Sequence, residues 1–360
     1  MMPLRFLTKR TWRVAYVRNA AISIITCAAL AVGAGGATAE ETVVFAGWGG
    51  SIQQNQRDIL FDSFEKETGI RVIDTTDVSY AKIKAMVDAG DVQWDVVQTL
   101  GMWTKPGIAE NLFEPLDYTI IDATGIPRAE VGYYAIGNSQ YALGFAYNTD
   151  ALAGAPAPQS WADFWDAENF PGRRGFRTLS RYMTEYALLA DGVPMDEIYP
   201  MDVDRAFASL DKLKPHVSVW SKSAEQAVQI IAGGEVAMGF TTHTRAFDAK
   251  KEGIPLEFVW QGAVMTVDNL IVPRGAKNKE NAMKLINWMS NAENQASFAE
   301  ATSIGPSNER ALQFVSDEVR DKLPTTHFLE GELLRFGDDW WADNIQAVDE
   351  RMLTWAQGIN

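Results

Sequence analysis

The segment VDNLIVPRGAKNKENAMKLINWMSNAENQASFAE, residues 267–300, indicates the fold more clearly than any other stretch of the 360-residue chain. It opens with an acid, Asp268, at the head of an apolar run, Leu270–Val272, that predicts a strand. Pro273 and Gly275 then turn the chain into an amphipathic helix. A strand that leads through a short turn into a helix is a building unit of α/β proteins.

The same alternation continues on both sides of this segment, so we predict an α/β protein. Upstream, the signals follow a βαβαβ order, with strands at 42–46, 70–73 and 94–98 and helices at 53–68 and 81–89. Farther along, we expect a strand at 141–148 and a helix that Ser160 caps. The remaining predicted elements are a strand at 236–240 and helices at 203–213, 224–232, 309–314 and 339–357.

The first 39 residues have the composition of a secretory signal peptide. Five basic residues and no acid flank an apolar run at 20–32 on its N-terminal side, and Ala37-Thr38-Ala39 forms a small-residue cleavage site. The run is shorter than the ~20 residues that a membrane-spanning helix needs, which argues against a membrane anchor. We therefore expect export to the periplasm, with cleavage after Ala39.

The mature chain is acidic and free of cysteine. Cys27, the single cysteine, lies inside the apolar run after Thr26, a context that does not fit a lipidation signal. The mature chain therefore has no disulfide and no thiolate metal site. Removing the five basic residues of the signal peptide takes the formal net charge from −15 to −20. Such a charge argues against nucleic acid and anionic lipid as partners, and it mildly favours a cationic ligand.

Seven blocks along the mature chain carry a resemblance to a known family. They are VVFAGWGG at 43–50, FEKETGIRV at 64–72, WDVV at 94–97, FEPLDY at 113–118, SWADFWD at 160–166, GEVAMGF at 234–240 and the 267–300 segment. In their order and spacing these blocks resemble the spermidine/putrescine-binding family, which comprises periplasmic solute-binding proteins of ABC importers. The resemblance covers nearly all of the mature chain.

The resemblance implies a two-lobe, type II periplasmic-binding-protein fold that closes around a small ligand. It places residues 40–145 and 268–304 in lobe 1 and residues 146–267 and 305–360 in lobe 2. The protein would then be a monomeric carrier without a cofactor, and its partner would be an inner-membrane ABC permease. An exported enzyme on the same scaffold is the alternative class, but the chain has no GxSxG, HExxH or phosphate-loop motif.

Several lobe 1 residues match the ligand site of that family. Trp48 matches a tryptophan that stacks on the alkyl chain of the ligand, and Gly49 and Gly50 would let the backbone approach it. Thr99 and Trp103 fall where lobe 1 lines the cleft. The alternative for Trp48 is a packing role in the core.

Asp268 matches the family acid that pairs with an ammonium group, because a buried cation needs a carboxylate partner. A strand-end role is the alternative for this residue. Polyamine binders also carry a pair of acids at the start of a lobe 2 helix, where this chain reads TLSRY at 178–182, with no acid before Glu185. The second amine site of the family is therefore missing from the pattern, and Arg181 stands in its place.

Phe240 and Arg245 lie at the end of a predicted lobe 2 strand, where family members present cleft residues. Arg245 suits a carboxylate, and Arg181 is a second candidate for that role. Together, Asp268 and Arg245 suit a zwitterion such as γ-aminobutyrate or another ω-amino acid, unless the two residues pair with each other. The pattern leaves the ligand open among polyamines, ω-amino acids, opines and betaines.

No metal site is expected from the sequence. The three histidines, His216, His243 and His327, lie far apart and follow no metal-ligand spacing. Tyr133 and Tyr134 resemble the tyrosine pair of ferric-ion binders, but they fall in lobe 1 rather than lobe 2. A ferric-ion binder is therefore a disfavoured alternative.

Overall fold

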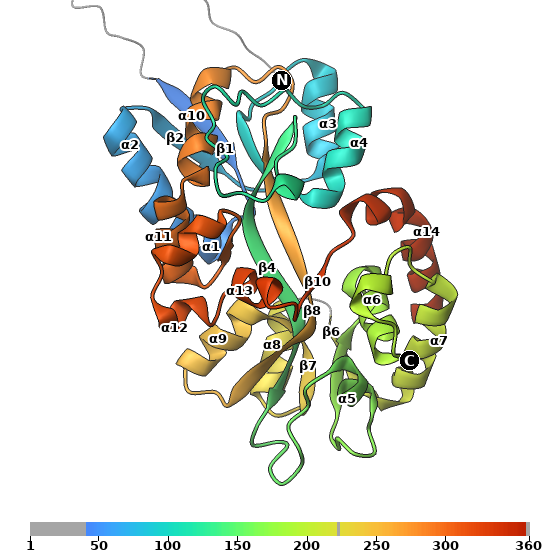
Figure 1. Ribbon diagram of the computed structural model, residues 1–360. Helices are drawn as coiled ribbons and strands as arrows, with labels where there is room; N and C mark the ends of the chain where they lie inside the picture. The colour runs from blue at the N-terminus through green and yellow to red at the C-terminus, as the bar shows by residue number, and fades with distance from the viewer. Residues whose placement is uncertain (1–40, 222–223, 358–360) are drawn as a thin grey trace, which may run out of the picture. The chain divides into compact units, whose positions relative to one another are not determined.

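The computed structural model describes residues 41–221 and 224–357 of the chain (Figure 1). These residues belong to one compact unit. The predicted signal peptide, residues 1–39, lies outside the described residues. Within the described ranges no helix is long and apolar enough to cross a membrane. Strands and helices alternate along the chain, which confirms the prediction of an α/β protein.

One sheet of ten strands runs through the molecule, and its two longest strands, β4 (Ala135–Asn148) and β8 (Leu256–Ile271), pair at its centre. Beyond β8 the order continues β3, β1, β2, and beyond β4 it continues β7, β5, β6. These strands are β1 (Thr42–Ala46), β2 (Arg71–Thr75), β3 (Val96–Leu100), β5 (Arg174–Arg177), β6 (Val217–Ser221) and β7 (Met238–Thr242). Two short strands, β9 (Gly305–Pro306) and β10 (Leu334–Arg335), pair with β4 and β8. The long antiparallel pair therefore connects two groups of parallel strands (Figure 1).

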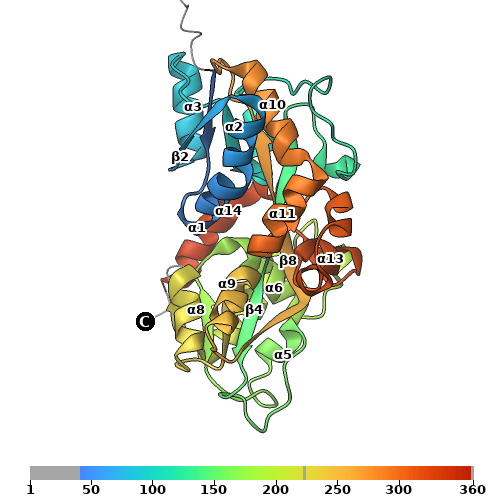
Figure 2. The same cartoon turned by 90° about the vertical axis from the view of Figure 1, so that its left-hand side faces the viewer.

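Helices cover both groups of strands, with α3 and α10 beside the first group and α8 and α9 beside the second (Figures 1 and 2). In the first half they are α1 (Gly50–Gln56), α2 (Asp62–Thr68), α3 (Tyr80–Ala89), α4 (Thr104–Ala109), α5 (Trp161–Trp165), α6 (Ser180–Ala190) and α7 (Val203–Leu213). In the second half they are α8 (Ala224–Ala232), α9 (His243–Lys251), α10 (Lys279–Ser290), α11 (Ala292–Thr302), α12 (Asp317–Arg320), α13 (Pro324–Leu329) and α14 (Asp338–Ala356).

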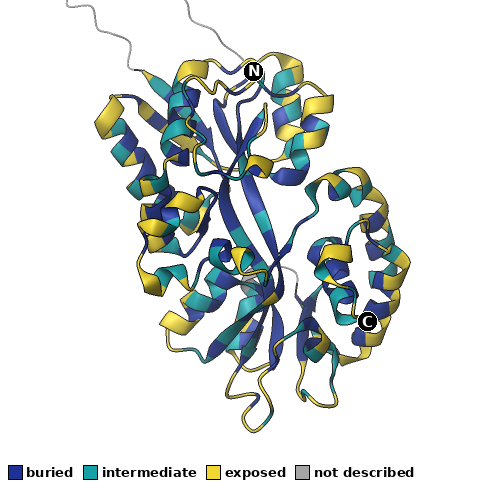
Figure 3. Cartoon of the chain, in the orientation of Figure 1, coloured by how far each residue is buried: buried dark blue, intermediate teal, exposed yellow. Residues whose placement is uncertain are grey.

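The apolar side chains gather in two main cores, one for each group of strands. The first core includes Phe61 and Ile286, which lie between the outer helices and the sheet. The second includes Phe164, Tyr186 and Trp341, so α14 at the end of the chain packs into this core. β4 and β8 are mostly buried along the stretch that joins the two groups (Figure 3). The connection is therefore a covered pair of strands rather than an exposed linker.

Local signals explain most of the helix ends. Ser160 accepts a hydrogen bond from the Asp163 N–H, and Asp163 accepts one in return from the Ser160 N–H, so the predicted cap of α5 is confirmed as a capping box. The helical stretch after Pro273 is two helices rather than one. Asn291 separates them, because its side chain accepts hydrogen bonds from the first N–H groups of α11.

Other predicted boundaries move. The helix expected at 53–68 begins at Gly50 and contains a π-helical segment, Arg57–Phe61, between α1 and α2. The strand expected at 141–148 begins at Ala135, and the one expected at 236–240 occupies 238–242 instead. The helix expected at 309–314 is a 3₁₀ segment over Glu309–Gln313.

Candidate functional site

A buried carboxylate lies at the centre of the candidate site. Asp268 stands on β8, where it pairs with Leu100 of β3 and Ser139 of β4, and it is 4% exposed. Its Oδ2 accepts hydrogen bonds from Gln98 Nε2 and Trp48 Nε1, both at 2.8 Å. Burial raises the pKa of Asp268 to about 6, although the two hydrogen bonds oppose that rise. Both donors are neutral, so they do not balance the charge of the ionised carboxylate.

Trp48 reaches Asp268 from the turn that follows β1. Gly49 and Gly50 adopt φ angles of 80° and 68°, in the left-handed region that glycine enters without a steric penalty. The turn starts α1, and the Gly49 N–H donates to Gln53 Oε1 at 2.8 Å. Glycine at both positions therefore gives the chain the sharp turn that brings the indole N–H to the Asp268 carboxylate.

Aromatic rings extend the site along the first group of strands. The ring of Trp103 meets Trp48 edge-on with centroids 5.8 Å apart, and it meets Tyr80 at 6.2 Å. Trp48 remains 36% exposed, although its indole nitrogen is bonded. Partly exposed rings beside a buried acid suit a ligand with an apolar chain and a charged end.

Strand alternation separates Gln98 from its predicted neighbour Thr99. Asp268 pairs with Leu100, so Gln98, two residues away, shares its face of the sheet. Thr99 points to the other face, where its hydroxyl donates to the Asn269 carbonyl at 3.4 Å. The sequence reasoning missed Gln98. Side chains alternate between the two faces of a strand, but this alternation identifies Gln98 only when the pairing of β3 with β8 is already known.

A second set of groups approaches Asp268 from the start of α6. Arg181 Nη1 donates to Met102 Sδ at 3.5 Å. Tyr182 has a φ of 71°, an unfavourable conformation for a bulky residue, and the chain breaks its helical path there. Burial raises the pKa of Tyr182 to about 12, Arg181 opposes the rise, and the carboxylates of Asp268 and Asp338 add to it. Tyr182 therefore lies close enough to sense the charges of Arg181, Asp268 and Asp338.

Asp338 is the second site residue that the sequence reasoning missed. It begins α14, and its carboxyl group packs against Gly101, where a Cβ atom would lie 2.6 Å from it. Burial raises the pKa of Asp338 to about 7; Arg335 opposes this rise, and the charges of Asp339 and Asp268 add to it. In a sequence, an acid in the first turn of a helix is typical of a residue that compensates the helix dipole. The residues around Asp338 therefore gave no sign that it belongs to a ligand site.

Two further predicted residues stand on β7 and α9. Phe240 is 1% exposed, and its ring packs near Tyr186 and under the guanidinium of Arg177, so it supports the second core. Arg245 stands in the first turn of α9, where its backbone N–H donates to Thr242 Oγ1 at 3.5 Å. The structure thus brings Trp48, Trp103 and Asp268 together, with Gly49 and Gly50 shaping the turn, and it places Arg181 beside Met102.

Glu185, the first acid after the missing pair, is engaged in the core. Its carboxylate accepts hydrogen bonds from Tyr199 Oη and Trp341 Nε1, both at 2.6 Å, and from Thr184 Oγ1. Burial raises the pKa of Glu185, and these hydrogen bonds oppose the rise. The residue therefore fastens α14 to α6 rather than facing a ligand.

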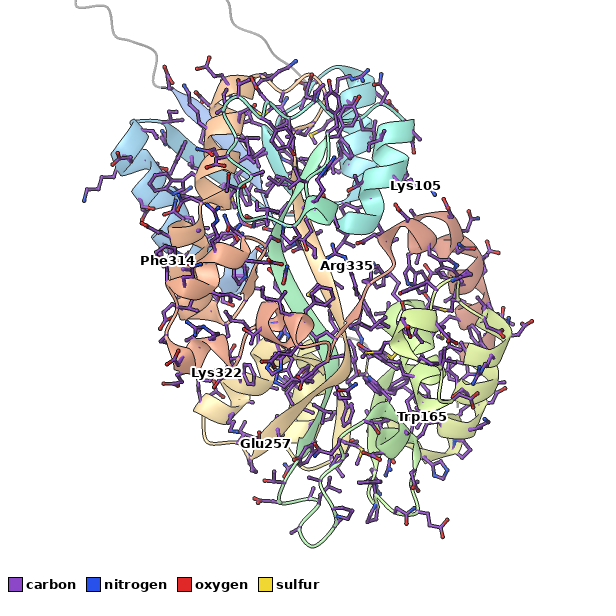
Figure 4. All side chains as sticks on the ribbon, viewed as in Figure 1. Lys105, Trp165, Glu257, Phe314, Lys322 and Arg335 are labelled. Carbon is purple, nitrogen blue, oxygen red and sulfur yellow. The ribbon has the colours of Figure 1, made fainter. Side chains whose placement is uncertain are left out.

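The opposite face of β8 borders a cavity of about 490 Å³. Its lining includes Asn269 and Glu130, and Glu130 Oε1 accepts a hydrogen bond from Arg335 Nη1 at 2.9 Å (Arg335 is labelled in Figure 4). Asp338 also borders this space. Nearby, Lys105 of α4 forms an ion pair with Asp343 of α14 (Figure 4). Among the described residues, the side chains that converge as metal ligands do are those of His327, Glu330 and Glu332.

Comparison with known proteins gives consistent matches. Residues 60–325 match a family model described as bacterial extracellular solute-binding protein. The chain is 35% identical over 336 residues to a γ-aminobutyric acid-binding protein of Pseudomonas aeruginosa, covering 91% of this chain and 94% of that protein. It is 28% identical over 341 residues to a spermidine/putrescine-binding periplasmic protein of Escherichia coli K12, covering 90% and 94%.

A solved structure has the same fold. The crystal structure of an ABC transporter substrate-binding protein from Bradyrhizobium japonicum superposes on this chain with a TM-score of 0.83 and 31% identity, covering 88% of this chain and 99% of that one. The prediction of a periplasmic-binding-protein fold is therefore confirmed.

Proposed function

The chain belongs to the bacterial extracellular solute-binding proteins, and we propose that its ligand is a short ω-amino acid such as γ-aminobutyrate. It is a substrate-binding component of an ABC transporter and not an enzyme. The observation that carries the proposal is the buried carboxylate of Asp268, whose hydrogen-bond donors are both neutral, while Tyr182 senses the charges of both Asp268 and Arg181.

Asp268 would bind the ammonium end. Its charge is buried, and the hydrogen bonds from Trp48 and Gln98 are neutral, so a ligand cation supplies the balancing charge. These two hydrogen bonds also fix the orientation of the carboxylate. The ring of Trp48 would cover the methylene groups next to the ammonium.

Arg181 would bind the carboxylate end. The acceptor that its Nη1 finds is the thioether of Met102, which is a weak acceptor. A ligand carboxylate accepts far stronger, charge-assisted hydrogen bonds, and it can do so in a bidentate way. Arg245, at the start of α9, is the second candidate for this role.

A polyamine is the second candidate ligand, and Asp338 favours it. This carboxyl group lies close enough to Asp268 for the two charges to interact, so it could hold a second amine. Two observations favour the amino acid. Glu185 is held by Tyr199 and Trp341, and the relative named for γ-aminobutyric acid is 35% identical, against 28% for the polyamine binder.

We infer that binding closes two lobes, 40–145 with 268–304 and 146–267 with 305–360, about the strands that join them. A ligand that contacts both lobes only in the closed form shifts the population toward closure. The closed monomer would then be the form that an inner-membrane permease distinguishes. We further propose that the protein reaches the periplasm by cleavage after Ala39.

Calorimetric titration of matched ligands tests the proposal. 4-Aminobutyrate should bind wild-type protein, whereas butylamine, which lacks the carboxylate, should bind at least tenfold more weakly, since a charge-assisted hydrogen bond is worth about 1.5–3 kcal/mol. Arg181→Gln should abolish this preference, while Arg173→Gln, at an exposed arginine in the same half, should retain it. If Asp338→Asn removes putrescine binding and Arg181→Gln leaves every affinity unchanged, the ligand is a polyamine.

A further inference from the structure

A histidine and two glutamates meet on the surface formed by α13 and the turn after it. The nearest ligand atoms of His327, Glu330 and Glu332 all lie within 4.8 Å of one another. The side chain of His327 is 13% exposed and that of Glu332 is 39% exposed, so solvent reaches the cluster. A spacing of three and five residues after a histidine matches no common metal motif, which is why no motif search of the sequence would find the cluster.

The imidazole of His327 is held in one orientation. Trp260 of β8 stacks on it with centroids 3.8 Å apart and an interplanar angle of 16°. Its Nε2 lies 3.0 Å from the Asp321 carbonyl oxygen. A carbonyl oxygen can only accept, so Nε2 must carry the hydrogen, and Nδ1 is the atom that faces the glutamates.

Nδ1 lies 2.5 Å from Glu332 Oε2. Nδ1 and Glu332 Oε2 therefore converge on one point at the surface. At 2.5 Å a hydrogen lies between the two atoms; a zinc ion, with bonds of about 2.0–2.2 Å at tetrahedral angles, would replace it and move them to about 3.3 Å apart. A histidine that donates its other ring nitrogen to a backbone carbonyl has the arrangement that metal-binding histidines adopt, because the bond fixes the ring and the tautomer.

The backbone that carries Glu332 is hydrogen-bonded to α13 and to β8. The Glu332 N–H donates to the His327 carbonyl at 3.0 Å, and the Gly262 N–H of β8 donates to the Glu332 carbonyl at 2.8 Å. α13 itself is attached to the central strands, since Thr325 Oγ1 lies 2.8 Å from Gln140 Oε1 and 2.9 Å from the Pro306 carbonyl. The three side chains therefore converge from a preorganised turn.

We propose that His327, Glu330 and Glu332 bind one divalent transition-metal ion of the zinc class. One imidazole nitrogen with carboxylate oxygens is a donor set that zinc accepts, with water completing the coordination. Magnesium and calcium prefer oxygen donors alone, so they are poorer occupants. The site shares no residue with the Asp268 cluster, so it stands or falls independently of the ligand proposed above.

The test is a zinc titration of tag-free mature protein, followed by competition with a chromophoric chelator. We expect one zinc ion per chain, and His327→Gln, Glu330→Gln and Glu332→Gln should each weaken binding at least tenfold, because even outer-shell changes weaken metal sites by about 10–100-fold. His216→Gln, at an exposed histidine outside the cluster, is the matched control and should bind as wild type. Circular dichroism establishes that each variant is folded.

Zinc binding that is absent, or that survives unchanged in both His327→Gln and Glu332→Gln, would overturn the proposal. The same holds if magnesium displaces zinc at equal concentration. In those cases His327 and Glu332 form a hydrogen bond only, and any bound ion is adventitious.

Discussion

Replacing Asp268 with asparagine should stabilise the ligand-free protein while abolishing its affinity for an amine. The rise in the pKa of Asp268 from the ordinary value of 3.8 to about 6 means that the ionised group destabilises the folded state by roughly 3 kcal/mol at neutral pH. The asparagine side chain would carry no charge, although its amide meets the donors Trp48 and Gln98 less well, a loss of about 1 kcal/mol. The net expected gain at pH 7.5 is about 1–2 kcal/mol.

The stability difference between wild type and Asp268→Asn should depend on pH in a definite direction. The folded protein binds the Asp268 proton more tightly than the unfolded chain does, so stability falls as pH rises from about 4 to about 6. The asparagine variant has no group that ionises at this position, so it does not lose this stability. Between pH 5 and pH 7.5 the variant should therefore gain roughly 1.5 kcal/mol relative to wild type.

Urea denaturation of both ligand-free proteins at these two pH values measures the difference directly. The reasoning is refuted if Asp268→Asn is less stable than wild type at both pH values by a similar amount. That result would assign Asp268 a structural role at the strand end, without the buried and unbalanced charge on which the ligand site depends.

The structure leads to three further predictions. Ligand affinity should fall in acid, with a dissociation constant about elevenfold above its plateau at pH 5, because an ammonium binds only the ionised Asp268; titrations from pH 5 to 8 would contradict this if they were flat. Trp48→Phe keeps the ring but removes the N–H that bonds Asp268, so calorimetry should show a loss of about 1 kcal/mol in binding, and an unchanged affinity would rule out that bond. Arg174→Met should destabilise the fold by about 3 kcal/mol or more in urea, since the buried guanidinium serves four backbone carbonyls, whereas exposed Arg173→Met should change stability little; equal effects would contradict this.

Much of the fold could be predicted because local signals agreed with the final packing. The helix Val203–Leu213 has its predicted bounds, since Asp202 caps it and one face is apolar. The first part of β4 escaped prediction because Asn138, Ser139 and Gln140 are polar and yet buried. Gln140 bonds Glu130 and also Thr325, which lies 185 residues away in the chain.

The site was predictable only where one residue carries a recognisable role. Trp48 and Asp268 could be singled out, and they do meet. Gln98 could not, because its contact with Asp268 spans 170 residues and depends on strand register. Asp338 could not either, since its proximity to Asp268 depends on where α14 packs against the sheet. The choice between Arg181 and Arg245 likewise depends on tertiary placement rather than on any local pattern.

The central proposal, that this carrier takes an ammonium at Asp268 and a carboxylate at Arg181, is tested most directly by one comparison. Calorimetric titration of the mature protein at pH 7.5 with 4-aminobutyrate and with putrescine compares two ligands of similar length that share an ammonium end and differ at the other. We predict that 4-aminobutyrate binds at least tenfold more tightly, because a charge-assisted pair is worth about 1.5–3 kcal/mol. Tighter binding of putrescine would contradict the proposal that Arg181 binds a ligand carboxylate.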